Sequence, residues 1–425
     1  MRVYREPPAH LLATRWPNAS ADVELLEVVT PILESVRAEG DSALIRFTER
    51  FDGVSLTPRE LTVGVDEVED AYSMVTEEQV AALEESKRRL ETVESERIKG
   101  LTFTVELDGV DVRSTVKPLG CVGCYVPGGK ASYPSSLVMN VVPAKVAGVR
   151  RVVVCTPPGK DKKINPLTLV AADICGVDRV YRVGGAQAVA AMAYGSETVH
   201  RVDKIVGPGN KYVTAAKAGV SGVVAVDKPA GPSEVLVLAD DSADPRLIAL
   251  DMISQAEHGP GGLVGLVTTS PRLAEEAKRL LIESATRAPR RSVVEGVLRE
   301  GGFIYIVDSL EEAVEFADAL APEHLEVMTA DPRLVAEKVS SAGLIQAGPY
   351  TPVASTDYCM GANHVLPTGG YAKITAGITV MDYLKPVTVV ESTLKGLRNV
   401  RSHIKVLSDA EGLPSHGQAV EGRFR

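Results

Sequence analysis

The chain has 425 residues, 45% of them apolar and 24% charged, as in an ordinary globular protein long enough for two or three domains. Its 46 basic and 56 acidic residues give a net charge of −10 spread along the chain, which argues against nucleic acid or an anionic membrane as the main partner. Without an apolar run of signal-peptide or membrane-span length, and with only five loosely spaced cysteines, the protein is expected to be cytoplasmic.

The apolar pattern predicts helices first and then two runs of alternating strands and helices. Helical spacing with charges on the outer face extends from 22–40 to 76–97. The first alternating run has strands near 150–158, 178–185, 202–209 and 223–231, with helices at 165–177, 186–195 and 210–220. The second has strands near 233–240, 261–269, 303–309, 324–331 and 344–348, with helices at 244–258, 271–285, 310–322 and 332–343.

Strict alternation of this kind predicts parallel strands joined by right-handed crossovers, and therefore two doubly wound α/β sheets in tandem. From about Ile374 the alternation stops, and the rest of the chain has a mainly helical pattern. No short-period repeat and no low-complexity segment is visible.

Three glycine-rich turns lie near expected strand ends of the first sheet, where doubly wound sheets bind ligands. They are "YVPGGK" at Tyr125–Lys130, "VGGAQAVA" at Val183–Ala190 and "VGPGN" at Val206–Asn210. None has the G-x-G-x-x-G spacing, and a plain βα turn also needs glycine, so spacing alone leaves dinucleotide binding open. The nearby C-x-x-C of Cys121 and Cys124 fits two buried structural cysteines better than a metal or redox site.

Side chains suited to metal binding or catalysis gather in the second half of the chain. Gln255 and His258 in "SQAEHGP" lie three apart and share one helix face, although His258 could simply stabilise the end of the helix dipole. "APEHLEV" places Glu323 beside His324 at the start of a strand, where one loop could carry an acid and a base into a cleft.

Two further pairs of side chains suited to metal binding or catalysis lie later in the chain. Asp357 and His364 lie in "STDYCMGANHVLPTGG", and Glu411 and His416 lie in "EGLPSHGQAV". Each pair alone can be read as ordinary loop residues. Four such clusters in a chain with only seven histidines instead indicate a metal-binding or catalytic site.

These segments together resemble the histidinol dehydrogenase family. The resemblance is carried by "AGPSEVLVLAD", "SQAEHGP", "APEHLE", "DYCMGANHVLPTGG" and "EGLPSHGQAV", and by "YVPGGKASYPSSLVMNVVPAKVAGV", "VGGAQAVAAMAYG" and "KIVGPGNKYV", in the family's order. It covers nearly the whole chain. It implies oxidation of L-histidinol through L-histidinal to L-histidine with two NAD+, the final step of histidine biosynthesis.

The resemblance also implies a role for each candidate residue. One Zn2+ per subunit would be held by Gln255, His258, Asp357 and His416, and these ligands would also contact the substrate. His324 matches the general base and a substrate contact, and Glu323 matches the residue that activates water with it. Ser233, His364 and Glu411 match further substrate contacts, and Tyr125, Gln187 and Asn210 match the NAD+ contacts.

The implied architecture is two incomplete Rossmann-like domains in a homodimer with shared active sites. Glu411 and His416 would come from the neighbouring subunit. The expected divisions are an N-terminal arm (1–22), a discontinuous metal and substrate domain (23–119 and 235–373), an NAD domain (120–234) and a C-terminal helical tail (374–425).

Three other functions use the same residues. A paralogue could oxidise another small alcohol, but the retention of His364 and Glu411, matched to imidazole-side contacts, favours histidinol. A zinc hydrolase with Glu323 as base would leave the glycine turns unused. A two-lobed binding protein would leave the Glu323–His324 pair unexplained and would normally carry a secretion signal.

Overall fold

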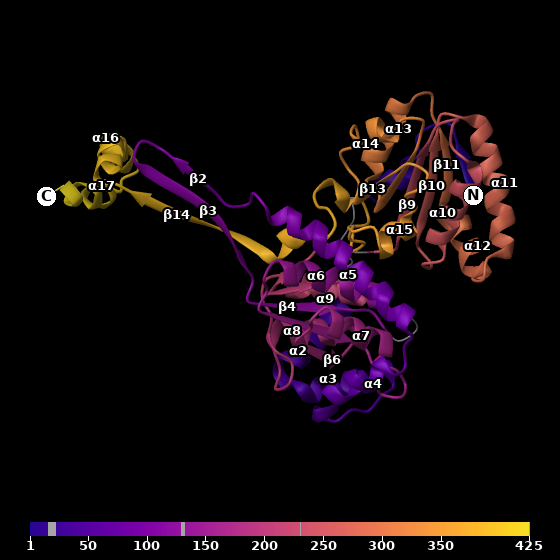
Figure 1. Cartoon of the computed structure of the whole chain (residues 1–425), viewed down its shortest axis with the longest axis horizontal. Coiled ribbons are helices and arrows are strands. Elements are labelled where there is room, and N and C mark those ends of the chain that lie inside the picture. Colours follow the sequence, from indigo (N-terminus) through magenta and orange to yellow (C-terminus); the bar gives the residue numbers. More distant parts are fainter. Residues whose placement is uncertain (16–22, 129–131, 230, 425) are drawn as a thin grey trace.

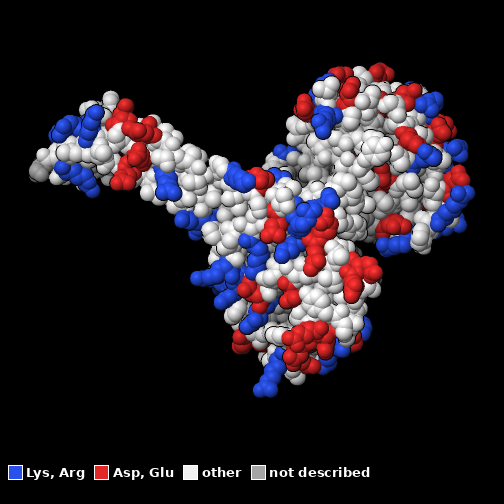
Figure 2. Space-filling model, viewed as in Figure 1, with Lys and Arg blue, Asp and Glu red and all other residues white. Residues whose placement is uncertain are grey.

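The computed structural model describes residues 1–15, 23–128, 132–229 and 231–424, which form two α/β domains and one slender arm (Figure 1). The arm carries the C-terminus away from both domains (Figure 1), and the space-filling view shows it projecting from their surface (Figure 2). The segment 16–22 of the predicted N-terminal arm, and Gly129 and Lys130 of the first glycine turn, lie outside the described residues. None of the helices built by the described residues combines the length and apolarity needed to cross a bilayer.

The first domain is built on a five-stranded parallel sheet with the order β6-β5-β4-β7-β8. The chain starts at β4, moves outward to β6, and then returns to β7 and β8 on the other side, which confirms the predicted doubly wound arrangement. The strands are β4 (Cys121–Tyr125), β5 (Arg151–Thr156), β6 (Arg179–Arg182), β7 (Lys204–Val206) and β8 (Ala225–Val226). The helices between them are α6 (Pro134–Val146), α7 (Pro166–Ile174), α8 (Gly185–Tyr194) and α9 (Lys211–Val220).

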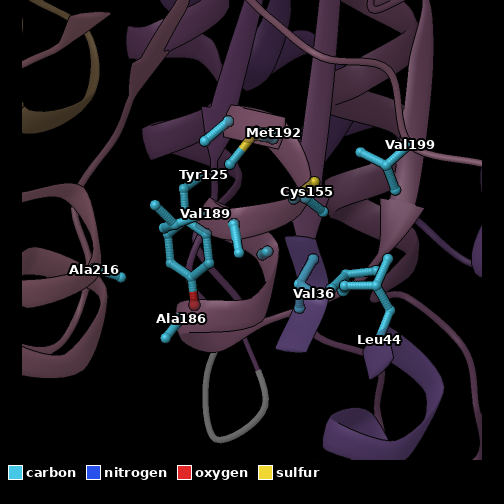
Figure 3. Packing of buried hydrophobic residues seen from close by; sticks show 14 of the residues in the cluster. Val36, Leu44, Tyr125, Cys155, Ala186, Val189, Met192, Val199 and Ala216 are labelled. Carbon is cyan, nitrogen blue, oxygen red and sulfur yellow. The ribbon is translucent and has the colours of Figure 1, made fainter. Parts of the chain in front are cut away.

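The helices between residues 23 and 98 belong to this same domain. α2 packs on α8 and α9, α3 on α8, α4 on α7, and α5 on α6 and α7. Figure 3 shows Val36 and Leu44, from α2 and α3, in one core with Val189 and Met192 of α8. The expectation that 23–119 would join the second domain is therefore wrong for these helices, because periodicity identifies a helix but not the sheet it covers. Their bounds are α2 (Val23–Glu39), α3 (Asp41–Asp52), η1 (Pro58–Leu61), α4 (Val65–Tyr72) and α5 (Glu77–Ile98).

The second domain is a six-stranded parallel sheet with the order β1-β11-β10-β9-β12-β13. It too starts in the middle, at β9, and is wound in both directions. The strands are β1 (Arg2–Tyr4), β9 (Glu234–Ala239), β10 (Leu263–Thr268), β11 (Gly302–Ile306), β12 (His324–Met328) and β13 (Leu344–Ala347). The helices are α1 (Ala9–Ala13), α10 (Pro245–Ala256), α11 (Pro271–Arg287), α12 (Arg291–Glu300), α13 (Leu310–Leu320), α14 (Pro332–Ala336) and α15 (Val353–Tyr358).

The start of the chain belongs to this second domain. β1 pairs with β11 at the edge of the sheet, and α1 packs on α13. Residues 1–15 are therefore part of a folded domain, which differs from the expected free arm over 1–22. A three-residue strand with exposed positions has too little apolar periodicity to be recognised in the sequence.

The arm is a three-stranded antiparallel sheet, ordered β14-β3-β2, that leads into two helices (Figure 1). β14 (Leu384–Ser392) pairs along its whole length with β3 (Val110–Pro118), and β2 (Phe103–Glu106) pairs with the other side of β3. The prediction of a mainly helical tail missed β14, because its partner strand lies far away in the sequence. The remaining elements are η2 (Tyr371–Lys373), η3 (Val380–Tyr383), α16 (Leu394–Ala410), α17 (Pro414–Glu421) and η4 (Gly422–Phe424).

Candidate active site

The substrate-side residues predicted from the sequence lie at the amino ends of the six-stranded sheet. Ser233 directly precedes β9, Glu323 directly precedes β12, and His258 lies in the turn between α10 and β10. This edge is opposite to the carboxyl ends, where we expected ligands to bind. The sequence does place Glu323 and His324 at the start of a strand, so here the order of strands and helices predicts the edge better than the general rule for ligand binding does.

Glu323 is fixed by a buried network around Glu234. The backbone N–H of Glu234 donates to Oε2 of Glu323 at 2.8 Å, and the N–H of Glu323 donates to Oε2 of Glu234 at 3.2 Å. Arg15 pairs with both carboxylate oxygens of Glu234, at 2.5 and 2.6 Å, and donates to the Leu320 carbonyl at 2.8 Å. Burial raises the pKa of Glu323 well above its usual 4.5, so its ionised form is a stronger base than the carboxylate of an exposed glutamate.

His324 is buried and held at one ring nitrogen. Its Nδ1 lies 2.9 Å from Nε2 of Gln346, and its Nε2 lies 3.9 Å from Oδ1 of Asp357. Burial, with smaller contributions from the nearby rings of His364 and His258, lowers the pKa of His324 to about 3. The ring is therefore neutral over the ordinary pH range, in the state that can accept a proton.

His364 joins the site to the first domain. Its Nδ1 lies 2.6 Å from the carbonyl oxygen of Asp357, and its Nε2 lies 3.2 Å from Oγ of Ser136 on α6. The neighbouring Asn363 donates to the Met139 carbonyl, also on α6, at 2.7 Å. Burial lowers the pKa of His364 to about 4. These contacts place the site where the two domains meet.

Three of the four predicted zinc ligands lie on this edge. Gln255 is buried in the last turn of α10, and His258 follows it with Nδ1 3.4 Å from Oγ of Ser233. α10 packs against α15, which carries Asp357. Oδ1 of Asp357 is buried without a hydrogen-bond partner among the described residues, and burial raises the pKa of this carboxyl to about 7. A carboxylate oxygen without a hydrogen-bond partner, on a helix that packs against the helix of Gln255, is the kind of oxygen donor that zinc accepts.

The remaining predicted ligand, His416, and the predicted substrate contact Glu411 do not reach this edge. Both side chains are exposed at the far end of the arm (Figure 1). Across 1–15, 23–128, 132–229 and 231–424, no group of three or more His, Cys, Asp or Glu side chains is placed to hold a metal ion. One chain therefore brings only three of the four predicted ligands, Gln255, His258 and Asp357, to this edge.

Tyr125 links the three glycine turns of the first domain. It ends β4 and is buried, and its phenol oxygen accepts a hydrogen bond from the N–H of Gly185, at the start of α8, at 3.1 Å. Figure 3 shows the ring directed towards Ala186 of α8. Gly207 of the third turn has φ +115°, and a Cβ there would lie 2.1 Å from the Tyr125 carbonyl oxygen. The turns after β4, β6 and β7 are thus packed together at the carboxyl edge.

The other two predicted NAD contacts are in the same region. Gln187 is buried in the first turn of α8, and both atoms of its side-chain amide lack a hydrogen-bond partner among the described residues. Asn210 is the N-cap of α9, where its side-chain oxygen accepts from the N–H groups of Tyr212 and Val213 at 3.0 and 3.1 Å. A cavity of about 480 Å³, lined in part by Gly128, opens at the carboxyl ends of β4 and β5.

The C-x-x-C pair lies inside β4, away from the catalytic edge of the second domain. Cys124 is fully buried and Cys121 is half-buried, and burial raises the pKa of both thiols. A raised thiol pKa disfavours the thiolate that redox and metal chemistry require. This supports the structural interpretation of the pair.

Four residues in these networks were not singled out from the sequence: Arg15, Ser136, Glu234 and Gln346. Glu234 and Gln346 do leave a signal, since each places a polar side chain in an otherwise apolar strand pattern, "SEVLVLAD" and "LIQAG". Arg15 and Ser136 leave none, because their partners are distant in the chain and only the fold brings them together.

Comparisons with known proteins agree over both domains and the arm. A family model described as "Histidinol dehydrogenase" matches residues 16–424. The histidinol dehydrogenase of Methanopyrus kandleri is 44% identical and covers 100% of both chains, and that of Methanocaldococcus jannaschii is 43% identical over 95% of this chain and 93% of the relative. The crystal structure of histidinol dehydrogenase from Elizabethkingia anophelis, 35% identical, superposes with a TM-score of 0.94 over 100% of this chain and 98% of that one.

Proposed function

The chain belongs to the histidinol dehydrogenase family, and from that premise we propose that its active site is completed by the C-terminal arm of a second copy of the chain. The reaction is the NAD-linked, two-step oxidation of L-histidinol through L-histidinal to L-histidine, the last step of histidine biosynthesis. The observation that carries the proposal is the position of His416 and Glu411, exposed on the arm, while the other matched residues line the edge between the domains.

The arm itself has the surface of a segment that is covered by another chain. Its exposed large apolar side chains are Leu394, Val400, Val406, Leu407 and Leu413 in or beside α16 and α17, Val389 and Val390 on β14, and Phe103, Val105 and Leu107 in or beside β2. Such a concentration of exposed apolar side chains on a projecting segment indicates a protein interface. A homodimer with exchanged arms would bury these side chains and deliver His416 to the neighbouring site.

We assign the zinc ligands to Gln255, His258 and Asp357 of one chain and His416 of the other. The buried, unpartnered Oδ1 of Asp357 supports this donor set. When bound, zinc supplies a Lewis-acidic centre that holds the nitrogen atoms of the substrate in a fixed orientation. Ser233, beside His258, and His364, beside Asp357, are placed to contact the same substrate.

We assign proton transfer to His324 and Glu323. Oxidation of an alcohol to an aldehyde removes a proton and a hydride, and neutral His324 is the group that can take the proton. The second oxidation needs a water molecule to add to the aldehyde. Glu323, the adjacent buried carboxyl with a raised pKa, is placed to accept a proton from that water together with His324.

We assign NAD+ to the carboxyl edge of the five-stranded sheet, where it would supply the hydride acceptor. Tyr125, Gln187 and Asn210 come from three turns that converge at this edge, and the unpartnered amide of Gln187 is available to a ligand. The link from His364 to Ser136 on α6 supports a site in which this edge and the catalytic edge serve one reaction. All five cysteines are free thiols, in keeping with the proposed cytoplasmic location.

The metal assignment is tested by counting NADH formed per L-histidinol consumed, with and without a chelator. We expect two NADH per substrate, loss of turnover on chelation, and recovery with Zn2+. A protein freed of metal, shown to be so by elemental analysis, that keeps full turnover would contradict the assignment.

The shared site is tested by mixing two inactive variants, His416→Ala and His324→Asn. If each site combines His324 of one chain with His416 of the other, a mixed dimer has one site with both lesions and one with neither. Activity should therefore return on mixing, to at most half of the wild-type value per mixed dimer. Mixed dimers, confirmed by differently tagged chains, that stay inactive would place the arm in its own subunit's site.

A further inference from the structure

We infer that the buried ion pair between Lys217 and Asp227 positions the turn Val206–Asn210 for the dinucleotide. The inference rests on the proposed function, because that function makes this turn part of the NAD+ site. Among the described residues, the polar partners of the pair are Gly207 and each other, not Tyr125, Gln187 or Asn210, so we treat both as positioning residues.

The pair holds the two peptide groups that flank Gly207 in the turn. The backbone N–H of Gly207 donates to Oδ2 of Asp227 at 2.7 Å, and Nζ of Lys217 donates to the carbonyl oxygen of Gly207 at 2.6 Å. Lys217 and Asp227 also form a direct ion pair through Oδ1. Gly207 is therefore fixed at its donor and at its acceptor by one closed ring of contacts.

The surroundings make this ring strong. The side chains of Lys217 and Asp227 are only 8% and 2% exposed, so water competes little for either charge. Asp227 follows β8 and its own N–H donates to the Ile205 carbonyl of β7 at 3.1 Å. Lys217 lies on α9. The ring thus joins β7, β8 and α9, the three elements that surround the turn.

The fixed glycine determines where two of the proposed NAD contacts stand. Gly207 has φ +115° and passes so close to Tyr125 that a Cβ would lie 2.1 Å from the Tyr125 carbonyl oxygen. Three residues later Asn210 caps α9, the helix that also carries Lys217. A rotation of either peptide group beside Gly207 would move the turn against Tyr125 and displace Asn210. The ion pair therefore sets the distance between these two proposed NAD+ contacts.

The test uses Lys217→Met, Asp227→Asn and the double variant, with NAD+ affinity of the full-length, zinc-loaded enzyme measured by titration calorimetry. We expect each single variant to bind NAD+ about tenfold or more weakly, while KM for L-histidinol changes little. The double variant leaves no unpaired buried charge, so it remains folded even where a single variant does not. It still lacks the lysine donor to Gly207, and it should also bind NAD+ more weakly.

Lys204→Met is the matched control. Lys204 lies at the other end of β7, partly buried, and its Nζ donates to the backbone and side chain of Asp382 at 2.8 and 3.3 Å. Its loss removes a comparable lysine–aspartate contact without touching the turn, so NAD+ affinity should stay near the wild-type value. Melting temperatures of all variants show whether any loss of affinity is merely a loss of folded protein.

Asn210→Ala distinguishes a failure of the positioning role from a failure of the proposed NAD+ site. If Asn210→Ala weakens NAD+ binding but the folded double variant binds NAD+ like the wild type, the positioning role is overturned and the NAD+ site stands. If Asn210→Ala itself leaves NAD+ affinity unchanged, the proposed NAD+ contact fails first. Weakened binding in Asn210→Ala and in the double variant, but not in Lys204→Met, supports the inference.

Discussion

Glu234 and Glu323 each accept a hydrogen bond from the backbone N–H of the other, at 2.8 and 3.2 Å, across the neighbouring strands β9 and β12. Two acidic side chains in such contact repel each other if both are ionised. Arg15 resolves this by pairing with Glu234 through both carboxylate oxygens. Glu323 is then free to hold a proton, as its raised pKa indicates.

Replacing Arg15 is expected to destabilise the second domain. Arg15→Met leaves Glu234 buried and unpaired, a lesion that costs about 3–5 kcal/mol of unfolding free energy. Arg15→Lys keeps the charge but not the two-pronged contact, and should fall between this variant and the wild type. Urea unfolding measures the difference. Arg46→Met is the control, because the Arg46–Glu39 pair is exposed and should contribute less than about 1 kcal/mol. Equal stability of the Arg15→Met and Arg46→Met proteins would contradict the role given to Arg15.

Asp357 is expected to make the metal-free protein less stable as pH rises. Its pKa is about 7 in the folded chain and near 3.8 when unfolded, so between these values the folded state keeps a proton that the unfolded state loses. Below about pH 4, Asp357 does not lower the free energy of unfolding. As the pH rises from about 4 to about 7, the free energy of unfolding falls, by as much as about 4 kcal/mol.

Asp357→Asn isolates that effect. Without metal, the variant should be more stable than the wild type at pH 8, and the two should differ least near pH 4, because asparagine resembles the protonated acid. Adding Zn2+ at pH 8 should raise the melting temperature of the wild type much more than that of the variant. An equal rise in both proteins would remove Asp357 from the ligand set.

Gln346 is expected to control the orientation of His324. Its side-chain nitrogen lies 2.9 Å from Nδ1 of the ring, which leaves Nε2 directed at Asp357. Gln346→Leu removes this contact, so both oxidation steps should slow by about 100-fold, with little change in NAD+ affinity. Separate assays with L-histidinol and L-histidinal measure the two steps. Thr356→Val removes only the second partner of the Gln346 amide, at 3.1 Å, and should have a smaller effect. Normal rates in Gln346→Leu would show that packing alone orients His324.

Removal of the end of the arm is expected to abolish catalysis while both domains remain folded. A chain that stops after Ser392 keeps β14 paired with β3 and loses α16, α17 and η4, which pack mainly on one another and on β14. Its circular dichroism spectrum should show that both domains remain folded. Turnover should be lost because Glu411 and His416 are absent. A shortened chain that still oxidises L-histidinol would rule out the arm as a source of active-site residues.

Much of the fold could be predicted because it depends on short-range patterns. Apolar runs separated by turn residues predicted most strands of both sheets, and strict alternation with helices predicted their doubly wound order. The clusters around Gln255 and Glu323 were also visible, since chemically distinctive side chains lie within a few residues of each other. The sequence by itself thus determined the α/β class, the family and the reaction.

The tertiary structure decided which distant segments meet. In the folded chain the proposed catalytic residues lie at the amino edge of the six-stranded sheet, Arg15 pairs with Glu234, and Ser136 lies beside His364. In the folded chain, the helices of 23–98 pack in the domain of the five-stranded sheet, and β14 pairs with β3. The physical reason is that periodicity is a local property of the chain. These contacts instead depend on which apolar faces and polar groups fit one another after the chain has folded.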